Sequence, residues 1–165
     1  MSFINILKQA DIFYELTPTQ LELVASLCQE RRLNTGDLVF EENTPSDELY
    51  IIAQGEIEIQ VDPTLVGDNT TPPMGPVTIA TLRRGQSFGE VALVDQGLRS
   101  ATAKCAQHGT QLLVIPRDKL MMLCDTYPQL GYRLMRNLAA DLSLKIRNTD
   151  MRIREELLYG GHRRG

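Results

Sequence analysis

The sequence predicts a mainly β domain, a small barrel or sandwich with flanking helices. Short apolar segments separated by turn residues fill the middle of the 165-residue chain. A helix-capping pattern precedes them, and a long helical repeat of apolar residues follows them. This length fits one domain that can bury a hydrophobic core without disulfides.

The N-terminal helix is predicted to begin after Thr17, which can cap it, with Pro18 at the first helical position and Gln20 completing a capping box. Apolar residues then recur at helical spacing and predict one buried face: Leu21, Val24, Ala25 and Cys28. We expect the charged run at 30–32 to end this helix.

From residue 34 the pattern becomes that of short strands joined by turns. Strands are expected at 38–40, 49–53, 57–61, 77–82, near 99–106 and at 111–115. Gln54-Gly55 and the segment 107–110 predict tight connections between strands. Residues 62–76 are rich in Pro, Gly, Asp and Thr, which predicts a long exposed loop.

Two helices are expected after the strands. Asp118 can cap a short one, and Pro128 begins a longer one of ~30 residues that Gly160 ends. Its apolar stripe comprises Leu130, Leu134, Leu138, Leu142, Ile146, Ile153 and Leu157. One small domain cannot cover so long a stripe, so a homodimer through this helix is expected. The alternative is a helix folded back on the barrel.

Composition limits the partners and the compartment. The net charge is −4, which argues against a nucleic-acid-coating protein. The three cysteines, Cys28, Cys105 and Cys124, lie far apart among apolar neighbours, as buried free thiols of a reducing compartment do. Neither a signal peptide nor an apolar segment of membrane-spanning length is recognised, so we expect a cytoplasmic protein without membrane insertion.

The sequence does not favour catalysis. His108 falls in a predicted turn and His162 in a Gly- and Arg-rich tail, so neither has a setting for a catalytic triad. Cys-x-x-Cys, His-x-x-x-His and P-loop spacings are absent from the sequence. We therefore expect no enzyme and no bound metal.

Ligand-binding chemistry is concentrated in residues 87–103, which read SFGEVALVDQGLRSATA. Arg99 offers a planar fork of donors that matches phosphate oxygens, whereas the Glu90 carboxylate accepts hydrogen bonds from hydroxyl or amine groups. Gly89 allows a ligand to approach the backbone closely. This set suits a cyclic nucleotide. The alternative is that Glu90 and Arg99 pair with each other.

The motif FGEVAL, with RSATA beginning nine residues after the Glu, closely resembles the phosphate-binding cassette of the cyclic nucleotide-binding domain family. The likeness covers roughly residues 8 to 145, judged by pattern. It implies an eight-stranded jelly-roll-like β-barrel with N-terminal helices and a long C-terminal helix. It also implies a barrel domain at 1–126, a lid and dimerisation helix at 127–160 and a flexible tail at 161–165.

The resemblance implies that Arg99 binds the cyclic phosphate and Glu90 the ribose 2′-hydroxyl. Backbone amides next to them and the Ser100 hydroxyl would complete the pocket. The Ser100 hydroxyl could bind either the phosphate or the base, so it does not decide between cAMP and cGMP. We expect cAMP. The implied binding residues are Phe88, Gly89, Glu90, Val91, Ala92, Arg99, Ser100 and Ala101.

The sequence departs from the family pattern on the long helix. In the bacterial gene-regulator branch, paired hydroxyl residues there contact the base, whereas the matching positions here are Lys145 and Ile146. Ile146 could form an apolar lid instead. We therefore expect a cyclic nucleotide sensor that signals through its C-terminal helix to a second copy or an unknown protein. The alternatives are a ligand-free interaction scaffold and a transcription-regulator relative without its DNA-binding domain.

Overall fold

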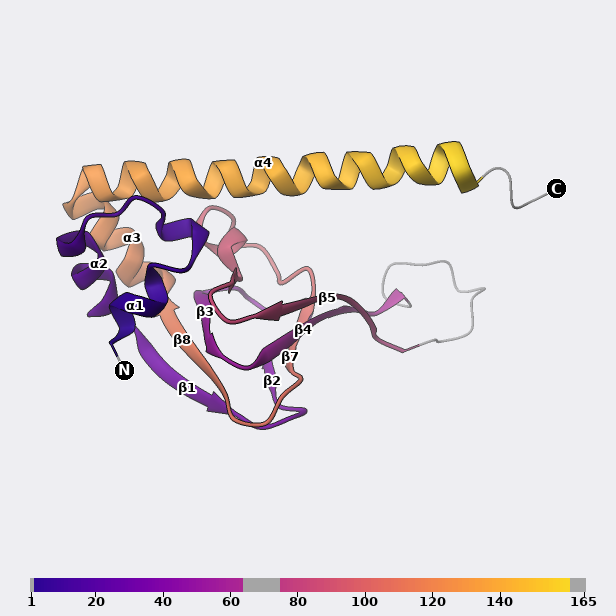
Figure 1. Ribbon diagram of the computed structural model, residues 1–165, viewed down its shortest axis with the longest axis horizontal. Helices are drawn as coiled ribbons and strands as arrows, with labels where there is room; N and C mark the ends of the chain where they lie inside the picture. Colours follow the sequence, from indigo (N-terminus) through magenta and orange to yellow (C-terminus); the bar gives the residue numbers. More distant parts are fainter. Residues whose placement is uncertain (1, 64–74, 161–165) are drawn as a thin grey trace.

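The computed structural model describes residues 2–63 and 75–160. Within these ranges eight strands form two four-stranded antiparallel sheets, ordered β1-β8-β3-β6 and β2-β7-β4-β5 (Figure 1). The first sheet contains β1 (Gln29–Leu33), β8 (Thr110–Pro116), β3 (Glu48–Gln54) and β6 (Ser87–Phe88). The second contains β2 (Leu38–Phe40), β7 (Thr102–Cys105), β4 (Glu56–Val61) and β5 (Val77–Arg83). The predicted mainly β fold with flanking helices is confirmed.

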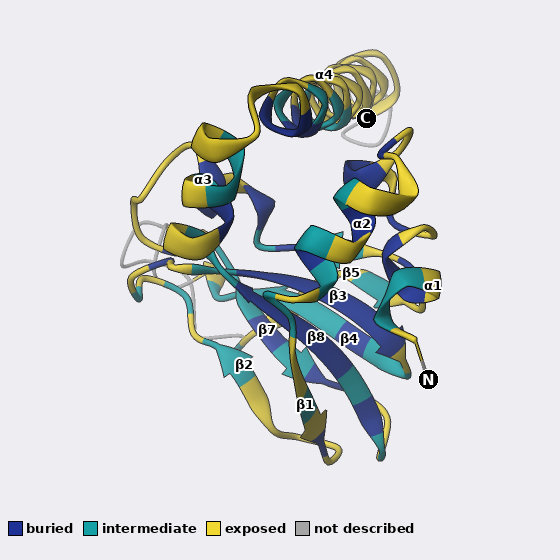
Figure 2. Ribbon diagram, turned by 90° about the vertical axis from the view of Figure 1, so that its left-hand side faces the viewer, coloured by how far each residue is buried: buried dark blue, intermediate teal, exposed yellow. Residues whose placement is uncertain are grey.

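Strand β3 separates two hydrophobic clusters, because consecutive side chains of a strand point to opposite faces. Leu49, Ile51 and Ala53 pack with the helices. Tyr50 and Ile52 face the other way, into the space between the two sheets. Figure 2 shows the helices lying over one side of the β3 and β8 strands, with buried residues on both. Residues 64–74 of the expected loop and the expected tail at 161–165 lie outside the described residues.

The N-terminal segment forms α1 (Phe3–Leu7), a 3₁₀ turn η1 (Asp11–Phe13) and α2 (Pro18–Ala25). The capping box that opens α2 is confirmed: the Thr17 hydroxyl accepts from the Gln20 amide, and the Gln20 side chain accepts from the Thr17 amide. Leu21 and Val24 are buried as predicted, whereas Ala25 and Cys28 are only partly buried.

The prediction that residues 30–32 end the first helix is wrong. Helix α2 ends at Ala25, and the charged run lies in the edge strand β1, where Glu30 pairs with Leu113 and Arg31 with Leu112 of β8. Most side chains of β1 are at least partly exposed, so the strand lacks the apolar alternation that would reveal it in the sequence.

The expected cap of the next helix is also wrong. Helix α3 (Arg117–Thr126) has Pro116 at its N-cap, and Asp118 is already a helical residue. The helix begins earlier because Arg117 is fixed from both ends: its amide donates to the Asp47 carbonyl and its Nε to the Ala92 carbonyl, both at 2.8 Å. This contact ties the start of α3 to the cavity-forming segment described below.

Helix α4 (Pro128–Tyr159) begins and ends where the sequence predicts. Its first turns pack on the domain through the buried side chains of Leu130, Leu134 and Leu138. The Asn137 amide also donates to the carbonyls of Ile12 and Tyr14. The second half of α4 extends straight beyond these contacts (Figure 1).

The three cysteines are free thiols. Cys105 is buried as predicted, whereas Cys28 and Cys124 are half-buried, which corrects the expectation of three buried thiols. Burial raises the pKa of the Cys28 thiol to about 12, and burial together with the Asp125 charge raises that of Cys124. Cys28 and Cys124 therefore stay protonated near neutral pH, which makes them poor nucleophiles.

Candidate ligand-binding site

The connection between β6 and β7, residues 89–101, begins with Gly89 and a 3₁₀ turn, η3 (Glu90–Leu93). Gly89 has φ +78°, and a Cβ atom there would lie 2.8 Å from Arg99 Nη1 and 3.2 Å from the Glu48 carbonyl oxygen. Glycine is therefore required twice, for the left-handed backbone and for the close approach of the arginine. The expected strand near 99–106 begins only at Thr102, because Arg99 belongs to this loop region.

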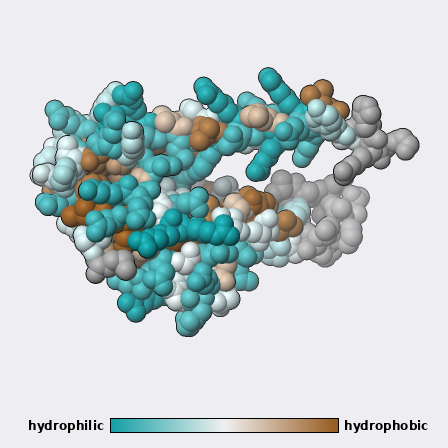
Figure 3. Space-filling model, viewed as in Figure 1, coloured by the Kyte–Doolittle hydropathy of each residue, from teal (hydrophilic) through white to brown (hydrophobic). Residues whose placement is uncertain are grey.

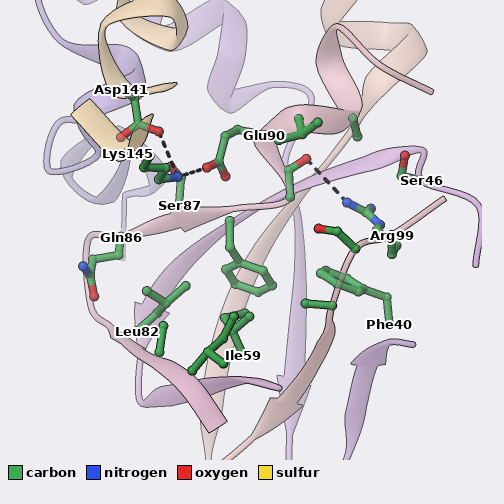
Figure 4. A pocket seen from close by; sticks show the side chains of 18 of the residues that line it. Phe40, Ser46, Ile59, Leu82, Gln86, Ser87, Glu90, Arg99, Asp141 and Lys145 are labelled. Atoms are coloured by element: carbon green, nitrogen blue, oxygen red, sulfur yellow. Dashed lines mark hydrogen bonds and ion pairs between the residues drawn. The ribbon is translucent and has the colours of Figure 1, made fainter. Parts of the chain in front are cut away.

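A cavity of about 780 Å³ lies against this loop. All eight residues proposed from the sequence line it, so the fold brings Phe88–Ala92 and Arg99–Ala101 together around one space. Its other walls come from the apolar side chains of Ile59 and Leu82 on the second sheet and from Asp141 and Lys145 on α4 (Figure 4). Arg152 of α4 lines the cavity as well.

Arg99 is a buried cation without a carboxylate partner among the described residues, and its side chain is 6% exposed. Nη2 donates to the Glu48 carbonyl at 2.9 Å, and Nη1 makes a long contact of 3.5 Å with the Gly89 carbonyl. Buried Nε has no hydrogen-bond partner. Burying an uncompensated charge is costly, so this guanidinium is arranged to receive an anion.

Two aromatic rings contact the guanidinium, and a third ring packs against them. The Arg99 side chain lies 4.2 Å from the ring centre of Phe40 and 5.7 Å from that of Tyr50, and the Tyr50 and Phe88 rings stack at 5.0 Å. Burial and the neighbouring Glu48 charge raise the pKa of the Tyr50 hydroxyl to about 12, so it stays neutral. The rings hold the arginine by cation–π contact without neutralising its charge.

Glu90 is buried as well, but its partner comes from another element. Lys145 Nζ on α4 donates to Glu90 Oε1, and it also pairs with Asp141 at 3.0 Å on the same helix. Burial alone would lower the pKa of Lys145, yet the pairs with Glu90 and Asp141 outweigh it, and the pKa is raised. The lysine is therefore charged at neutral pH.

Glu90 and Arg99 do not pair with each other, so the alternative of a loop staple is wrong. Figure 4 shows the Glu90 carboxylate turned toward Lys145 and away from the Arg99 guanidinium. Both side chains line the same cavity. The cavity thus presents a cation at one end and a carboxylate at the other, the two groups that a sugar phosphate would need.

Sequence reasoning missed Phe40, the Glu48 carbonyl and the role of Lys145. It identified position 145 as facing the site but assigned no contact to it. The suggested lid from Ile146 is not observed, because that side chain is 63% exposed and does not line the cavity. Lys145 and Arg152, which is two turns further along the same side of α4, line the cavity instead.

Within the described ranges, no group of three or more His, Cys, Asp or Glu residues is placed to hold a metal ion. In the same ranges, no helix combines the length and apolar character that crossing a membrane requires. His108 lies in the turn between β7 and β8, as expected, and His162 lies outside the described residues.

The fold and the cavity together define a ligand-binding regulatory domain. Its two sheets form a barrel, a buried arginine in the cavity can bind an anion, and a long helix lies over the cavity. The family model of the cyclic nucleotide-binding domain matches residues 30–127 of the chain, well over half of it. The chain belongs to the cyclic nucleotide-binding domain family, whose fold binds ligands for regulation and does not itself catalyse reactions.

Known proteins with this domain serve different purposes. The Cyclic AMP receptor protein of Thermus thermophilus is 30% identical over 89% of this chain and 62% of its own length. The human cGMP-dependent protein kinase 2 is 24% identical over 76% of this chain and 16% of its own length. The crystal structure of Thermus thermophilus Catabolite Activator Protein matches with a TM-score of 0.72 at 28% identity, covering 90% of this chain and 62% of that chain. The chain thus spans less than two thirds of the length of these relatives.

Proposed function

We propose that this chain is a sensor domain that binds a cyclic nucleotide, with cAMP as the preferred ligand. The buried Arg99 guanidinium is the observation that carries the proposal. It has no carboxylate partner among the described residues, its Nε is unpaired, and it faces a cavity large enough for a nucleotide. A cyclic phosphate would supply the missing negative charge and acceptors.

The proposed contacts follow from the donors and acceptors of the cavity. Arg99 binds the cyclic phosphate, and Glu90 accepts a hydrogen bond from the ribose 2′-hydroxyl. The remaining proposed groups are the amides of Gly89, Val91, Ala92 and Ala101, the Ser100 hydroxyl and the Phe88 ring. The apolar Ile59 and Leu82 side chains offer a wall against which a flat base can pack.

The preference for cAMP over cGMP is the finer part of this proposal. Relatives of both kinds occur: one is named a Cyclic AMP receptor protein and another a cGMP-dependent protein kinase. Ser100 can hydrogen-bond either the phosphate or a base, so it does not enforce guanine. The higher identity to the cAMP-named relative supports cAMP as the first ligand to test.

We also propose that residues 1–126 form the binding unit and that 127–160 form the output element, with a second copy of the chain as its partner. The distal apolar side chains of α4 support this, because Ile146, Ile153 and Leu157 are 63%, 50% and 76% exposed. Figure 3 shows hydrophobic atoms toward the far end of α4, among hydrophilic side chains. A helix of the partner would cover this stripe. A cytoplasmic location without DNA or membrane binding remains our prediction.

Thermal unfolding with cAMP, cGMP and 5′-AMP tests the ligand. A cyclic nucleotide at 100 times its dissociation constant stabilises the folded state by ~2.7 kcal/mol. We expect a rise in melting temperature with cAMP, a smaller one with cGMP and the least with 5′-AMP, whose extra phosphate charge and open ring do not match the site. Equal melting temperatures with and without every nucleotide would instead favour the ligand-free scaffold.

Light scattering tests the partner. We expect a dimer for the full chain and a shift toward monomer for Leu157→Glu, whose charge disrupts an apolar seam. Met122→Glu on α3 is the control, since it also replaces an exposed apolar residue by one negative charge, at a position away from the stripe. A monomer for the unmodified chain at high concentration contradicts the proposed partner and leaves ligand binding intact.

A further inference from the structure

Helix α4 contacts the rest of the domain in two different ways. Its first turns are anchored by buried leucines, which fix the helix irrespective of what the cavity holds. Beyond Leu142 the apolar side chains are exposed, and Lys145 joins the helix to the cavity through Glu90. The position of the distal half therefore depends on an ion pair with a residue of the proposed binding site.

Lys145 has a carboxylate partner on each of two elements. Glu90 belongs to the barrel and is 5% exposed, whereas Asp141 is one turn earlier on α4 itself, 3.0 Å from Nζ. If the contact with Glu90 is lost, Lys145 still has a counter-charge on its own helix. The lysine side chain is 54% exposed, so water can also solvate the ammonium group when the contact with Glu90 is lost.

A ligand hydroxyl and the Lys145 ammonium need the same carboxylate. Glu90 reaches the cavity from η3, and Lys145 reaches it from α4 and meets the Glu90 carboxylate there (Figure 4). A sugar held by Arg99 at one end and Glu90 at the other must pass through the space in front of Glu90. The ammonium group stands in that space.

We propose that Lys145 is a latch that holds α4 over the empty cavity and is released when a ligand hydroxyl takes its place on Glu90. Release leaves Lys145 paired with Asp141 alone, and the distal half of α4 is freed from the barrel. This inference rests on the proposed function, because it requires Glu90 to bind the ligand. It assigns to Lys145 the link between occupancy of the site and the state of the helix.

Calorimetric titration of the full chain with cAMP and cGMP provides the first test. Lys145→Met removes the competitor, so we expect the preferred nucleotide to bind about tenfold more tightly, equivalent to ~1.4 kcal/mol. Asp141→Asn removes the alternative partner and should weaken binding about threefold, equivalent to ~0.7 kcal/mol. Lys145→Arg retains the pair and should bind like the unmodified protein.

Hydrogen exchange of residues 143–159 provides the second test. In the unmodified protein, the nucleotide should increase exchange in this segment. In Lys145→Met the free protein should already exchange as fast as the ligand-bound unmodified protein, and ligand should add little. Arg147→Met is the matched control: it removes one positive charge from an exposed position of the same helix, and it should behave like the unmodified protein in both measurements.

The outcomes separate this inference from the function on which it rests. If the unmodified protein binds cAMP or cGMP and Lys145→Met binds equally or more weakly, the latch is overturned and the binding function stands. If neither protein binds either nucleotide, the proposed function fails and the competition fails with it. Tighter binding by Lys145→Met, weaker binding by Asp141→Asn and loss of the ligand effect on exchange support the latch.

Discussion

The two charged residues of the cavity, Arg99 and Glu90, are held by different parts of the fold. Arg99 is held by backbone carbonyls of Glu48 and Gly89 and lies over rings of the barrel. Glu90 is equally buried, but its charge is balanced by Lys145 from a helix outside the barrel. The cationic end is thus fixed by the fold, whereas the acidic end depends on the position of α4.

This difference separates recognition from response. A receptor for an anion gains affinity when its donors are already in place, because no ordering cost is paid on binding. A switch needs a contact that exists in one state and is replaced in the other. The Arg99 end meets the first requirement and the Glu90 end meets the second. Variants at the Arg99 end should therefore lose affinity, whereas variants of the Glu90–Lys145 contact should alter the response of α4.

The largest effect is expected at the fixed end. Arg99→Ala should weaken cAMP binding by about 2–5 kcal/mol, because the phosphate would enter a buried site without its counter-charge. Arg99→Lys should restore only part of the affinity, since an ammonium lacks the planar fork. Calorimetry measures both, on protein whose melting temperature confirms folding.

Arg31→Ala is the control for this prediction. Arg31 also lies over the Tyr50 ring, at 6.0 Å, but it is 41% exposed, is paired with Glu48 and does not line the cavity. Its removal should leave affinity within about twofold. Equal affinities of Arg99→Ala and the unmodified protein would mean that the barrel end is not the phosphate receptor.

A smaller effect is expected from Gly89→Ala, which displaces the arginine without removing it. The left-handed backbone costs about 1–2 kcal/mol for a residue with a Cβ atom. Here that atom would also lie 2.8 Å from Arg99 Nη1, so cAMP affinity should fall together with stability. Calorimetry and chemical denaturation separate the two losses.

Gly109→Ala isolates the backbone cost. Gly109 has nearly the same φ, +77° against +78°, and a Cβ there meets no atom within 4 Å. It should lose similar stability and keep full cAMP affinity. Loss of affinity in both variants would attribute the effect to global destabilisation and not to the Arg99 end.

The sequence predicted the parts of this molecule whose signals are local. The capping box of α2, the hairpin at Gly55 and the start of α4 at Pro128 each depend on residues a few positions apart. The eight proposed binding residues are also nearly contiguous, and the fold gathers them around one cavity. Local patterns therefore located the loop that forms the cavity.

The contacts that complete the site could not be predicted because they connect distant segments. Lys145 lies 55 residues from Glu90, and nothing on an exposed helix distinguishes a lysine that pairs across the fold from one that does not. Phe40 reads as a strand residue, and its place beneath Arg99 depends on the pairing of β2 with β7. Strand β1 was missed for a related reason: its polar side chains face solvent, and only its pairing with β8 makes it a strand.

The smallest effect is expected from Phe40→Leu, which tests how far the fixed end depends on its aromatic support. The substitution keeps apolar bulk but removes the ring 4.2 Å from the Arg99 guanidinium. A cation–π contact of this kind contributes about 0.5–1 kcal/mol, so cAMP should bind about two- to fivefold more weakly. Phe40→Tyr keeps the ring and should bind like the unmodified protein. If Phe40→Leu also binds normally, the carbonyls of Glu48 and Gly89 suffice to position Arg99. The rings would then contribute only to the packing of the hydrophobic core.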